Sequence, residues 1–522
     1  MKTAIRRLMC LSLIVTGAFL SNEAQGQASQ AGYKQTWESV SNVEATPEWF
    51  KDAKFGIYTH WGPTSVAFEG MEENQRLPGW HGMHMWGKKG SKRWQTGTAQ
   101  SSEPSSNYKH HVKQFGNPQK YGYDYIIDQF KPTGFDAKEW AELFALSGAK
   151  FAGPVAMHHD NFAMWDSKAT RWNSMNYGGV DISAELKREV EELDMKFMAS
   201  FHHAFTWAFF AQAYDFKIDP SLHDLYGEPR EFGAEVSDAF LASWWAKLKE
   251  YIDTYQPDMI WFDWWLENFP EEERLKFLAY YYNKGLEWNK EVAVCYKEAT
   301  FTQETAINDY ERGRPNQIVD PAWLTDTSPG TWFYRSNAKF VEANELIDIL
   351  VDIVAKNGCM LLNVPPDPDG TIPDEMKKLL TEMGAWLQVN GEAIYATRTW
   401  DIFGEGPTRL PSGGHKIEEK AKIEYGNTDV RFTKKSDTEF YAIVLDKPDE
   451  QLSIKSLSTY IGLLNSNIQK IELLGSDEEI KWERNADGLI INAPTEYPTE
   501  HAHAFKIILG AYQEADIDGE ID

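Results

Sequence analysis

The sequence predicts an α/β protein, a (β/α)8-like TIM barrel followed by a C-terminal antiparallel β-sandwich. Short apolar runs alternate with segments of helical spacing between residues 55 and 397, as in a barrel of parallel strands. Beyond Trp400 the runs become short and alternating, with charged residues and turn signals between them. The 522 residues exceed a typical barrel of about 250 and leave room for a second domain.

The N-terminus has the parts of a secretory signal, which we place at residues 1–26. Basic residues precede an apolar stretch, Leu8 to Leu20, and Ala24-Gln25-Gly26 offers a small-x-small cleavage site. We therefore expect an exported protein, periplasmic or extracellular. No other stretch is long and apolar enough to span a bilayer. Only Cys295 and Cys359 would remain after cleavage, so no disulfide framework is expected.

The barrel is predicted at residues 27–400. Its strands are apolar runs too short to be helices, and seven of about eight strand units are the runs at 55–61, 151–156, 196–201, 257–263, 292–296, 359–364 and 393–397. The helices expected between them span 136–146, 182–193, 240–255, 270–284, 340–356 and 374–389. Residues 69–125 lack a sustained period and predict a long loop after the first strand.

The sandwich is predicted at residues 401–513. Its alternating strands are expected at 429–433, 439–445, 470–474 and 504–509. Residues 514–522 would form an acidic tail.

Composition limits the class of ligand. The formal net charge of -27 argues against nucleic acid, since phosphate binding requires clustered Lys and Arg. The 21 Trp, 23 Tyr and 28 Phe will mostly fill the core, but rings that reach a cleft can stack on the C–H faces of sugars.

Polar side chains follow four successive predicted strands, and these are His60, His158 with His159, His202 with His203, and Asp263. In an α/β barrel the C-terminal strand ends meet at one face, where chemistry collects. Neutral imidazoles can donate on one side and accept on the other, which suits the vicinal hydroxyls of a sugar.

A metal site is the alternative explanation, because His and Asp at strand ends also bind zinc in barrel hydrolases. The adjacent His158 and His159 would point to opposite sides of a strand, so at most one of them could join a shared ligand set. We therefore expect no metal ion and no organic cofactor.

Two carboxyl groups are needed by a retaining glycosidase, about 5–5.5 Å apart, one as nucleophile and one as acid/base. The candidates are Asp263 with either Glu298 or Glu311. Trp261 would form part of an apolar wall beside Asp263. The partner carboxyl is expected where burial keeps it protonated near neutral pH.

The chain resembles the α-L-fucosidases of glycoside hydrolase family 29 from about Trp49 to Trp400. The blocks that carry the resemblance are WFKDAKFGIYTHWG (49–62), HHD with Phe162 and Trp165 (158–165), IWFD (260–263), DTSPG through Tyr334 (326–334), Lys356 to Asn363, and NGEAIY (390–395). Their number and order make a chance similarity improbable.

The resemblance implies roles for particular residues. Asp263 would be the nucleophile that forms a covalent glycosyl-enzyme. Glu311 matches the acid/base best by position, and Glu298 is the fallback. The sugar would be bound by His60, His158 and His159, with Trp80, Trp261 and His203 nearby and Trp332 against the fucose methyl group.

Several positions depart from the family pattern. Gly79 and His81 flank Trp80 where the family has a Glu-Trp-Tyr element, so a ligand-binding Glu is absent. Met157 replaces a common Lys, and Lys297 lies near a place where some members use Arg. The expected function is a secreted retaining exo-glycosidase that removes terminal α-L-fucose. The alternatives are an exo-α-L-galactosidase acting on algal glycans and a non-catalytic sugar-binding barrel. The oligomeric state is left open.

Overall fold

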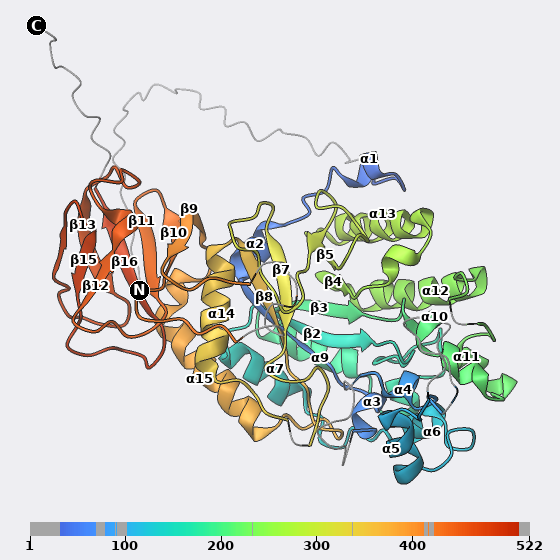
Figure 1. Ribbon diagram of the computed structural model, residues 1–522. Coiled ribbons are helices and arrows are strands. Elements are labelled where there is room, and N and C mark those ends of the chain that lie inside the picture. Colours follow the sequence, from blue (N-terminus) through green and yellow to red (C-terminus); the bar gives the residue numbers. More distant parts are fainter. Residues whose placement is uncertain are drawn as a thin grey trace, which may run out of the picture.

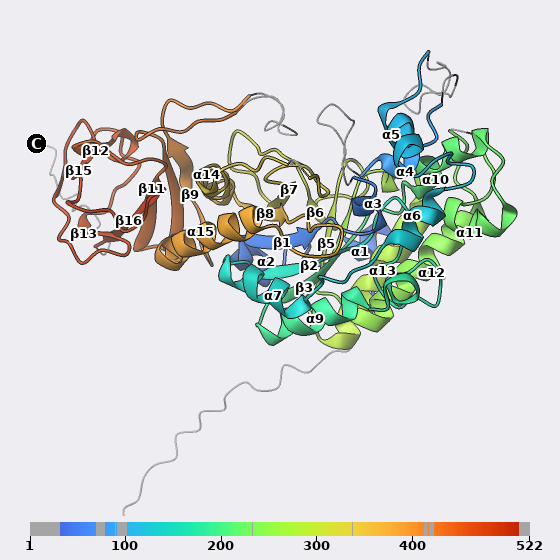
Figure 2. The same cartoon turned by 90° about the horizontal axis from the view of Figure 1, so that it is seen from below.

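The computed structural model describes residues 32–68, 79–88, 90, 102–231, 233–336, 338–411, 416 and 422–510. The predicted signal segment and acidic tail lie outside these ranges. The chain forms a barrel and a β-sandwich that lie side by side (Figures 1 and 2). In the described ranges, no helix is both long and apolar enough to cross a membrane.

The barrel consists of eight parallel strands, which confirms the predicted fold class. Its sheet has the order β6-β5-β4-β3-β2-β1-β8-β7, and a parallel bridge between Asp309 and Leu324 joins the two outer strands. The strands are β1 Phe55–Thr59, β2 Phe151–Met157, β3 Lys196–Phe201, β4 Met259–Phe262, β5 Ala293–Tyr296, β6 Ile307–Asn308, β7 Trp323–Thr327 and β8 Gly358–Asn363.

The strand predicted at 393–397 is wrong. A 3-10 turn, η4 (Gly391–Ala393), follows the last barrel helix, and Ala396 takes a left-handed conformation that a strand does not allow. The strand count is completed instead by β6 and β7. Within the segment predicted to be a long loop, the structure has α4 (His81–His84) and α5 (Ser106–Gln114).

Helices cover the outside of the barrel. The main ones are α7 Ala137–Leu146, α9 Ile182–Glu192, α12 Asp238–Tyr255, α13 Glu271–Trp288, α14 Ala343–Ala355 and α15 Asp374–Asn390. Side chains of Asp136, Asp181 and Ser237 accept hydrogen bonds from the first turns of α7, α9 and α12, which fixes where these helices begin. Shorter helices are α1 Trp37–Val40, α2 Glu48–Ala53, α3 Pro63–Val66, α6 Tyr123–Gln129, α8 Ser174–Gly178, α10 Thr206–Phe209 and α11 His223–Tyr226.

The sandwich is antiparallel, as predicted. One sheet has the order β13-β16-β11-β10-β9 and the other β12-β15-β14. The strands are β9 Arg398–Glu405, β10 Val430–Ser436, β11 Glu439–Val444, β12 Gln451–Ile454, β13 Ile468–Leu473, β14 Trp482–Arg484, β15 Leu489–Asn492 and β16 His503–Leu509. Trp400 stacks on Phe440 in a core separate from that of the barrel.

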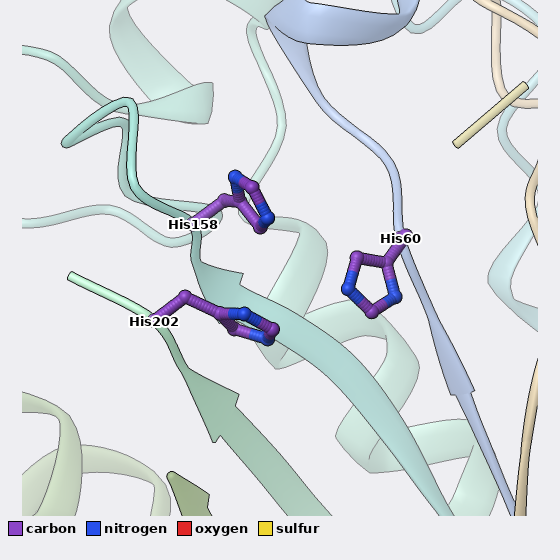
Figure 3. A group of neighbouring side chains, drawn as sticks. All are labelled: His60, His158 and His202. Atoms are coloured by element: carbon purple, nitrogen blue, oxygen red, sulfur yellow. The ribbon is translucent and has the colours of Figure 1, made fainter. Parts of the chain in front are cut away.

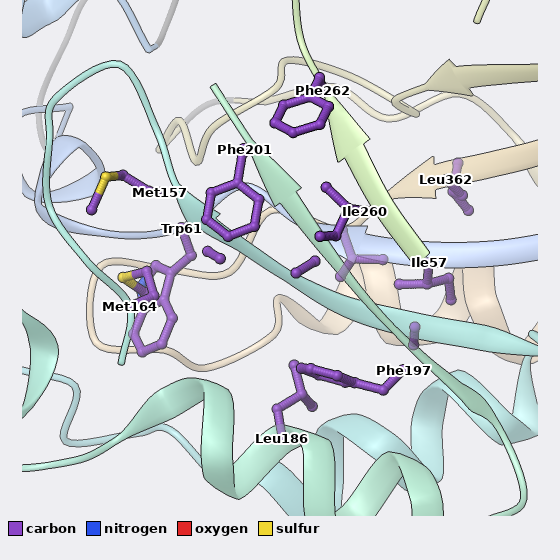
Figure 4. Close-up of a cluster of buried hydrophobic side chains, with 14 of the residues drawn as sticks. Ile57, Trp61, Met157, Met164, Leu186, Phe197, Phe201, Ile260, Phe262 and Leu362 are labelled. Atoms are coloured by element: carbon purple, nitrogen blue, oxygen red, sulfur yellow. The ribbon is translucent and has the colours of Figure 1, made fainter. Parts of the chain in front are cut away.

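Strand residues alternate between two buried layers. Ile57, Phe197 and Ile260 pack outward toward the helices, and Leu186 of α9 lies beside Phe197 (Figure 4). Their neighbours along the strands, such as Tyr58 and Trp261, belong to a second cluster that fills the barrel interior. This alternation decides which residues beyond the strand ends point into the barrel mouth.

Candidate active site

The predicted polar residues gather where the parallel strands end. His60 follows β1, His158 and His159 follow β2, and Asp263 follows β4. All four are buried. Asp263 lies two residues beyond Trp261 and therefore points to the same, interior side.

His202, rather than the predicted His203, reaches this group. Its Nδ1 lies 3.1 Å from Asp263 Oδ2, whereas the ring of His203 stacks on Trp244 of α12. The physical reason is alternation along β3: Phe197 and Phe201 face the helices, so His203 does too. The strand pattern contained this signal, because the polar Ser200 shares the side of His202.

Asp263 is held as a carboxylate. Its Oδ1 lies 3.2 Å from Lys297 Nζ, and its Oδ2 lies 3.5 Å from His159 Nε2. Burial alone would raise the pKa of Asp263, but Lys297 and His202 outweigh it and hold the pKa well below the usual range. A charged, desolvated carboxylate with few solvent contacts is suited to nucleophilic attack.

The imidazoles of His60, His158 and His159 are neutral. Burial lowers the pKa of His60 and His158 well below 6.5 and that of His159 to about 4. His60 Nδ1 donates to Asn363 Oδ1 at 2.9 Å, and the amide of Asn363 in turn donates to the carbonyl of Trp332. This network fixes the tautomer of His60 and leaves its Nε2 as an acceptor.

His159 is oriented in the same way. Its Nδ1 donates to the carbonyl of His202 at 2.8 Å, so Nε2 carries the free lone pair. His158 Nδ1 is buried with no hydrogen-bond partner among the described residues. A buried polar atom of this kind is costly unless a ligand satisfies it.

Two groups in the site could each hold a metal ion. The possible ligand atoms of His60, His158 and His202 lie within 4.8 Å of one another, and Figure 3 shows these three imidazoles from β1, β2 and β3. The same is true of His159, His202 and Asp263. The adjacent His158 and His159 fall into different groups, but their ring centroids lie only 4.2 Å apart in the same site. The expectation that they point to opposite sides is therefore wrong, because both follow the end of β2, where strand alternation no longer applies.

Lys297 connects three carboxyl groups. Its Nζ lies 3.2 Å from oxygens of Asp263, Glu311 and Asp326. Burial opposes its charge, but Asp326, Glu311 and Asp263 raise its pKa well above 10.5. Burial and Asp326 raise the pKa of nearby Asp309 strongly, which favours the protonated form of this carboxyl.

Glu311 lies in the turn after β6 and is nearly buried. Its Oε2 contacts Lys297, and its Oε1 lies 3.4 Å from Lys416. Burial and Asp263 raise the pKa of Glu311. Lys297 and Lys416 lower it by more, so the net shift is downward. The expectation that burial keeps this carboxyl protonated near neutral pH is therefore wrong for the ligand-free site.

Two other carboxyl groups lie nearby. Glu298, the fallback, is exposed. Glu267, which sequence reasoning missed, is half-buried in η3 (Leu266–Asn268), and its pKa is raised by burial and, in smaller measure, by Glu298 and Asp263. Glu267 follows Asp263 by one short turn, and only that spacing could have indicated it.

Aromatic rings form the walls. Trp261 is fully buried and donates from Nε1 to Asp309 Oδ2 at 2.6 Å. The ring of Trp332 lies 5.4 Å from that of His60, and the ring of Trp80 lies 5.8 Å from that of His159. The structure thus brings together every predicted sugar-contacting residue except His203.

Comparisons with known proteins agree with this site. Residues 19–392 match the family described as Alpha-L-fucosidase, and residues 424–508 match the Alpha-L-fucosidase C-terminal domain. The tissue alpha-L-fucosidase of Rattus norvegicus is 28% identical over 497 residues, which cover 91% of this chain and 92% of the relative. The alpha-L-fucosidase of Dictyostelium discoideum is 28% identical over 501 residues, 91% of this chain and 95% of the relative.

Solved structures show the same architecture. The Thermotoga maritima alpha-fucosidase in complex with a mechanism based inhibitor superposes with a TM-score of 0.69 at 25% identity, covering 91% of this chain and 100% of that one. An alpha-L-fucosidase GH29 from Bacteroides thetaiotaomicron has a TM-score of 0.62 at 20% identity and covers 93% and 98%. The chain therefore belongs to the α-L-fucosidases of glycoside hydrolase family 29 and is a glycoside hydrolase.

Proposed function

We propose that this protein is a retaining exo-α-L-fucosidase that removes terminal α-L-fucosyl residues by double displacement. One observation carries the retaining mechanism. Oxygens of Asp263 and Glu311 each lie 3.2 Å from Lys297 Nζ, so they cannot be farther apart than twice that distance. Retaining enzymes hold their two carboxyl groups about 5–5.5 Å apart, whereas inverting enzymes need about 6.5–9.5 Å.

In the first step, Asp263 attacks the anomeric carbon while Glu311 gives its proton to the departing glycosidic oxygen. An ester between Asp263 and fucose forms, and the aglycone leaves as an alcohol. In the second step, Glu311 takes a proton from water, the resulting hydroxide attacks the anomeric carbon, and Asp263 is released as a carboxylate.

The charge of Asp263 assists this change of role. The carboxylate of Asp263 raises the pKa of Glu311 in the free enzyme, although Lys297 has the larger, opposite effect. Once Asp263 is esterified, its charge is gone and the pKa of Glu311 falls. Loss of that charge favours the ionised form of Glu311, which is the form that a base needs in the second step.

The neutral histidines would bind the sugar hydroxyls. His60 and His159 each present an accepting Nε2, and His158 presents an unsatisfied nitrogen. Trp332 would pack against the C5 substituent of the sugar.

The fucose assignment has one competitor, α-L-galactose, which carries a hydroxyl on the C5 substituent. A Cβ at Gly79 would lie 3.1 Å from the ring of Phe333 and 3.7 Å from His158, and the φ of Gly79 is +104°. Phe333 thus occupies space beside His158 that a side chain at position 79 would need. An exo-α-L-galactosidase acting on algal glycans is the alternative, and relative kcat/KM on aryl α-L-fucoside and aryl α-L-galactoside distinguishes the two.

Azide rescue tests both carboxyl roles. We expect Asp263→Gly to lower kcat on aryl α-L-fucoside by about 10³-fold or more, and azide to restore turnover with an inverted, β-L-fucosyl azide product. Azide added to Glu311→Gly should instead give the retained α-L-fucosyl azide, because the covalent intermediate still forms. Glu298→Gly and Glu267→Gly are the matched controls. Wild-type activity of Asp263→Gly would refute the nucleophile assignment.

Two other functions remain as outcomes of the same experiments. A non-catalytic sugar-binding barrel would bind fucose and turn over no α-L-glycoside. A metal-dependent hydrolase using the two histidine groups would lose activity with EDTA and regain it with Zn²⁺. We expect EDTA to leave kcat/KM unchanged.

We also propose that residues 1–26 direct export to the periplasm or the extracellular space. The proposal is supported by the basic, apolar and small-residue pattern of the sequence. Mature protein that begins after Gly26 in the exported fraction would support it, and full-length protein confined to the cytoplasm would refute it.

A further inference from the structure

A lysine from the sandwich side of the molecule reaches the candidate acid/base. Lys416 lies between β9 and β10, the first two strands of the sandwich. Its Nζ lies 3.4 Å from Glu311 Oε1, and its backbone N–H donates to the carbonyl of Glu311 at 2.8 Å. One residue therefore holds both the side chain and the main chain of Glu311.

The turn around Glu311 needs such support. Glu311 and Arg312 are consecutive non-glycine residues with φ of +24° and +47°, in a region that L residues rarely adopt. Strained backbone of this kind persists only where the surroundings hold it. On the barrel side, the N–H of Glu311 donates to Asp309 Oδ1 at 2.8 Å, and that of Arg312 donates to the carbonyl of Asp326.

The far end of the same turn is also tied to the sandwich. Arg314 Nε donates to Asp352 Oδ2 of α14 at 2.8 Å, and Arg431 Nε of β10 donates to Asp352 Oδ1 at 2.5 Å. The segment that carries Glu311 is thus anchored to the C-terminal domain on both sides.

We propose that Lys416 is a positioning residue of the fucosidase reaction, through which the C-terminal domain orients Glu311 and sets its charge. The proposal rests on the acid/base role given to Glu311 above. Nothing in that role required a residue from beyond the barrel.

The charged groups that face Glu311 determine the expected effect. Lys297, which follows β5, and Lys416 favour its carboxylate, whereas burial and Asp263, which follows β4, favour its protonated form. Asp326 from β7 shares Lys297 with it. Lys416 is half-exposed, so solvent screens its share. Removal of Lys416 should raise the pKa of Glu311 and extend the protonated, acid form to higher pH.

The test is the pH profile of kcat/KM on an α-L-fucosyl disaccharide, whose leaving sugar needs a proton. We expect Lys416→Met to move the alkaline limb upward by about half a pH unit and to lower kcat. Lys416→Arg should restore both. Lys422→Met is the matched control, because Lys422 lies in the same interstrand segment, exposed and paired with exposed Glu424.

The outcomes separate this inference from the proposed function. If the alkaline limb and kcat are both unchanged in Lys416→Met while Glu311→Gln loses activity on the disaccharide, the role of Lys416 is overturned. Full activity of Glu311→Gln on the disaccharide would overturn the acid/base assignment itself, and with it this inference. An equal shift of the alkaline limb in Lys422→Met would also overturn this inference, because the shift would then follow from the loss of any positive charge in this segment.

Discussion

Buried histidines make the protein sensitive to acid at the level of single residues. Burial lowers the pKa of His60, His81, His158 and His203 well below 6.5, and that of His111 and His159 to about 4. A group whose pKa is lower in the folded than in the unfolded chain binds its proton preferentially when unfolded. Each such histidine stabilises the fold above pH 6.5 and loses that contribution as pH falls toward its folded pKa.

His111 offers a test away from the sugar site. Its Nε2 donates to the carbonyl of Tyr121 at 2.7 Å, so its Nδ1 accepts from His81 Nε2 at 3.2 Å. One neutral histidine of this kind lowers the free energy of unfolding by roughly 2 kcal/mol at pH 5 relative to pH 7.5. We therefore expect His111→Gln to gain stability relative to wild type as pH falls from 7.5 to 5, measured as urea midpoints.

The comparison with wild type is needed because other buried groups titrate in the opposite direction. Burial raises the pKa of Asp160 to about 6 and that of Asp348 to about 8, so these carboxyl groups stabilise the fold as pH falls. Both are present in wild type and in His111→Gln, and their effect cancels in the difference. A difference that does not vary with pH would contradict the neutral state of His111.

At the scale of the element, the sequence predicted the positions where strands end better than it predicted the number of strands. The run before Asp263 is apolar and bounded by turn residues, so β4 and the position of Asp263 follow from local pattern. β6 has two residues, Ile307 and Asn308, and exists only because β5 lies beside it. No local period can indicate so short a strand. The run at 393–397 has strand-like residues, but it lies between the end of helix α15 and the first sandwich strand, β9, where the chain leaves the barrel.

The candidate site was predictable where one strand end acts alone. His60, His158, His159 and Asp263 each follow an apolar run. The contacts of Lys297 with Glu311 and Asp326 join the ends of β5, β6 and β7, and that closure depends on the two strands which the sequence pattern did not reveal. The lowered pKa of Glu311 depends in addition on Lys416, from outside the barrel.

The contact between α15 and α7 gives a test at this scale. A Cβ on Gly384 of α15 would lie 2.0 Å from the carbonyl oxygen of Leu146, at the end of α7. Backbone cannot move aside as a flexible side chain can, so Gly384→Ala should force the helices apart. We expect a net loss of about 1–3 kcal/mol in the free energy of unfolding, despite the better helix propensity of alanine.

Urea denaturation measures this loss. Gln388→Ala, an exposed position on the same helix, is the matched control and should change stability by less than about 0.5 kcal/mol. Wild-type stability of Gly384→Ala would mean that the two helices pack less closely than the structure shows.

For the whole molecule, α14 joins the two domains. Every residue from Leu346 to Ala355 is buried, and the helix contacts β8 of the barrel and β9 and β10 of the sandwich. A helix that is buried all round normally carries no charge. Asp352 is the exception, since it contacts Arg314, Lys356 and Arg431 at 2.8, 2.7 and 2.5 Å.

The charged cluster of Asp352, Arg314, Lys356 and Arg431 links stability to activity. Burial opposes the charge of Asp352, but Arg431, Lys356 and Arg314 hold its pKa well below the usual range. Asp352→Asn would leave three buried cations without their shared anion. We expect a loss of about 3–5 kcal/mol in the free energy of unfolding, the usual cost of removing one partner from a buried ion pair.

Calorimetry and urea unfolding of the full chain would measure the loss. Asp253→Asn is the matched control, because Asp253 pairs with Lys249 and Lys284 at the surface and should cost no more than about 1 kcal/mol. Since Arg314 follows Glu311 in the same turn, kcat on the fucosyl disaccharide should fall in Asp352→Asn at temperatures where the variant is still folded. Equal stability of the two variants would mean that the cluster does not hold the domains together, and support of Glu311 from the sandwich side would then come from Lys416.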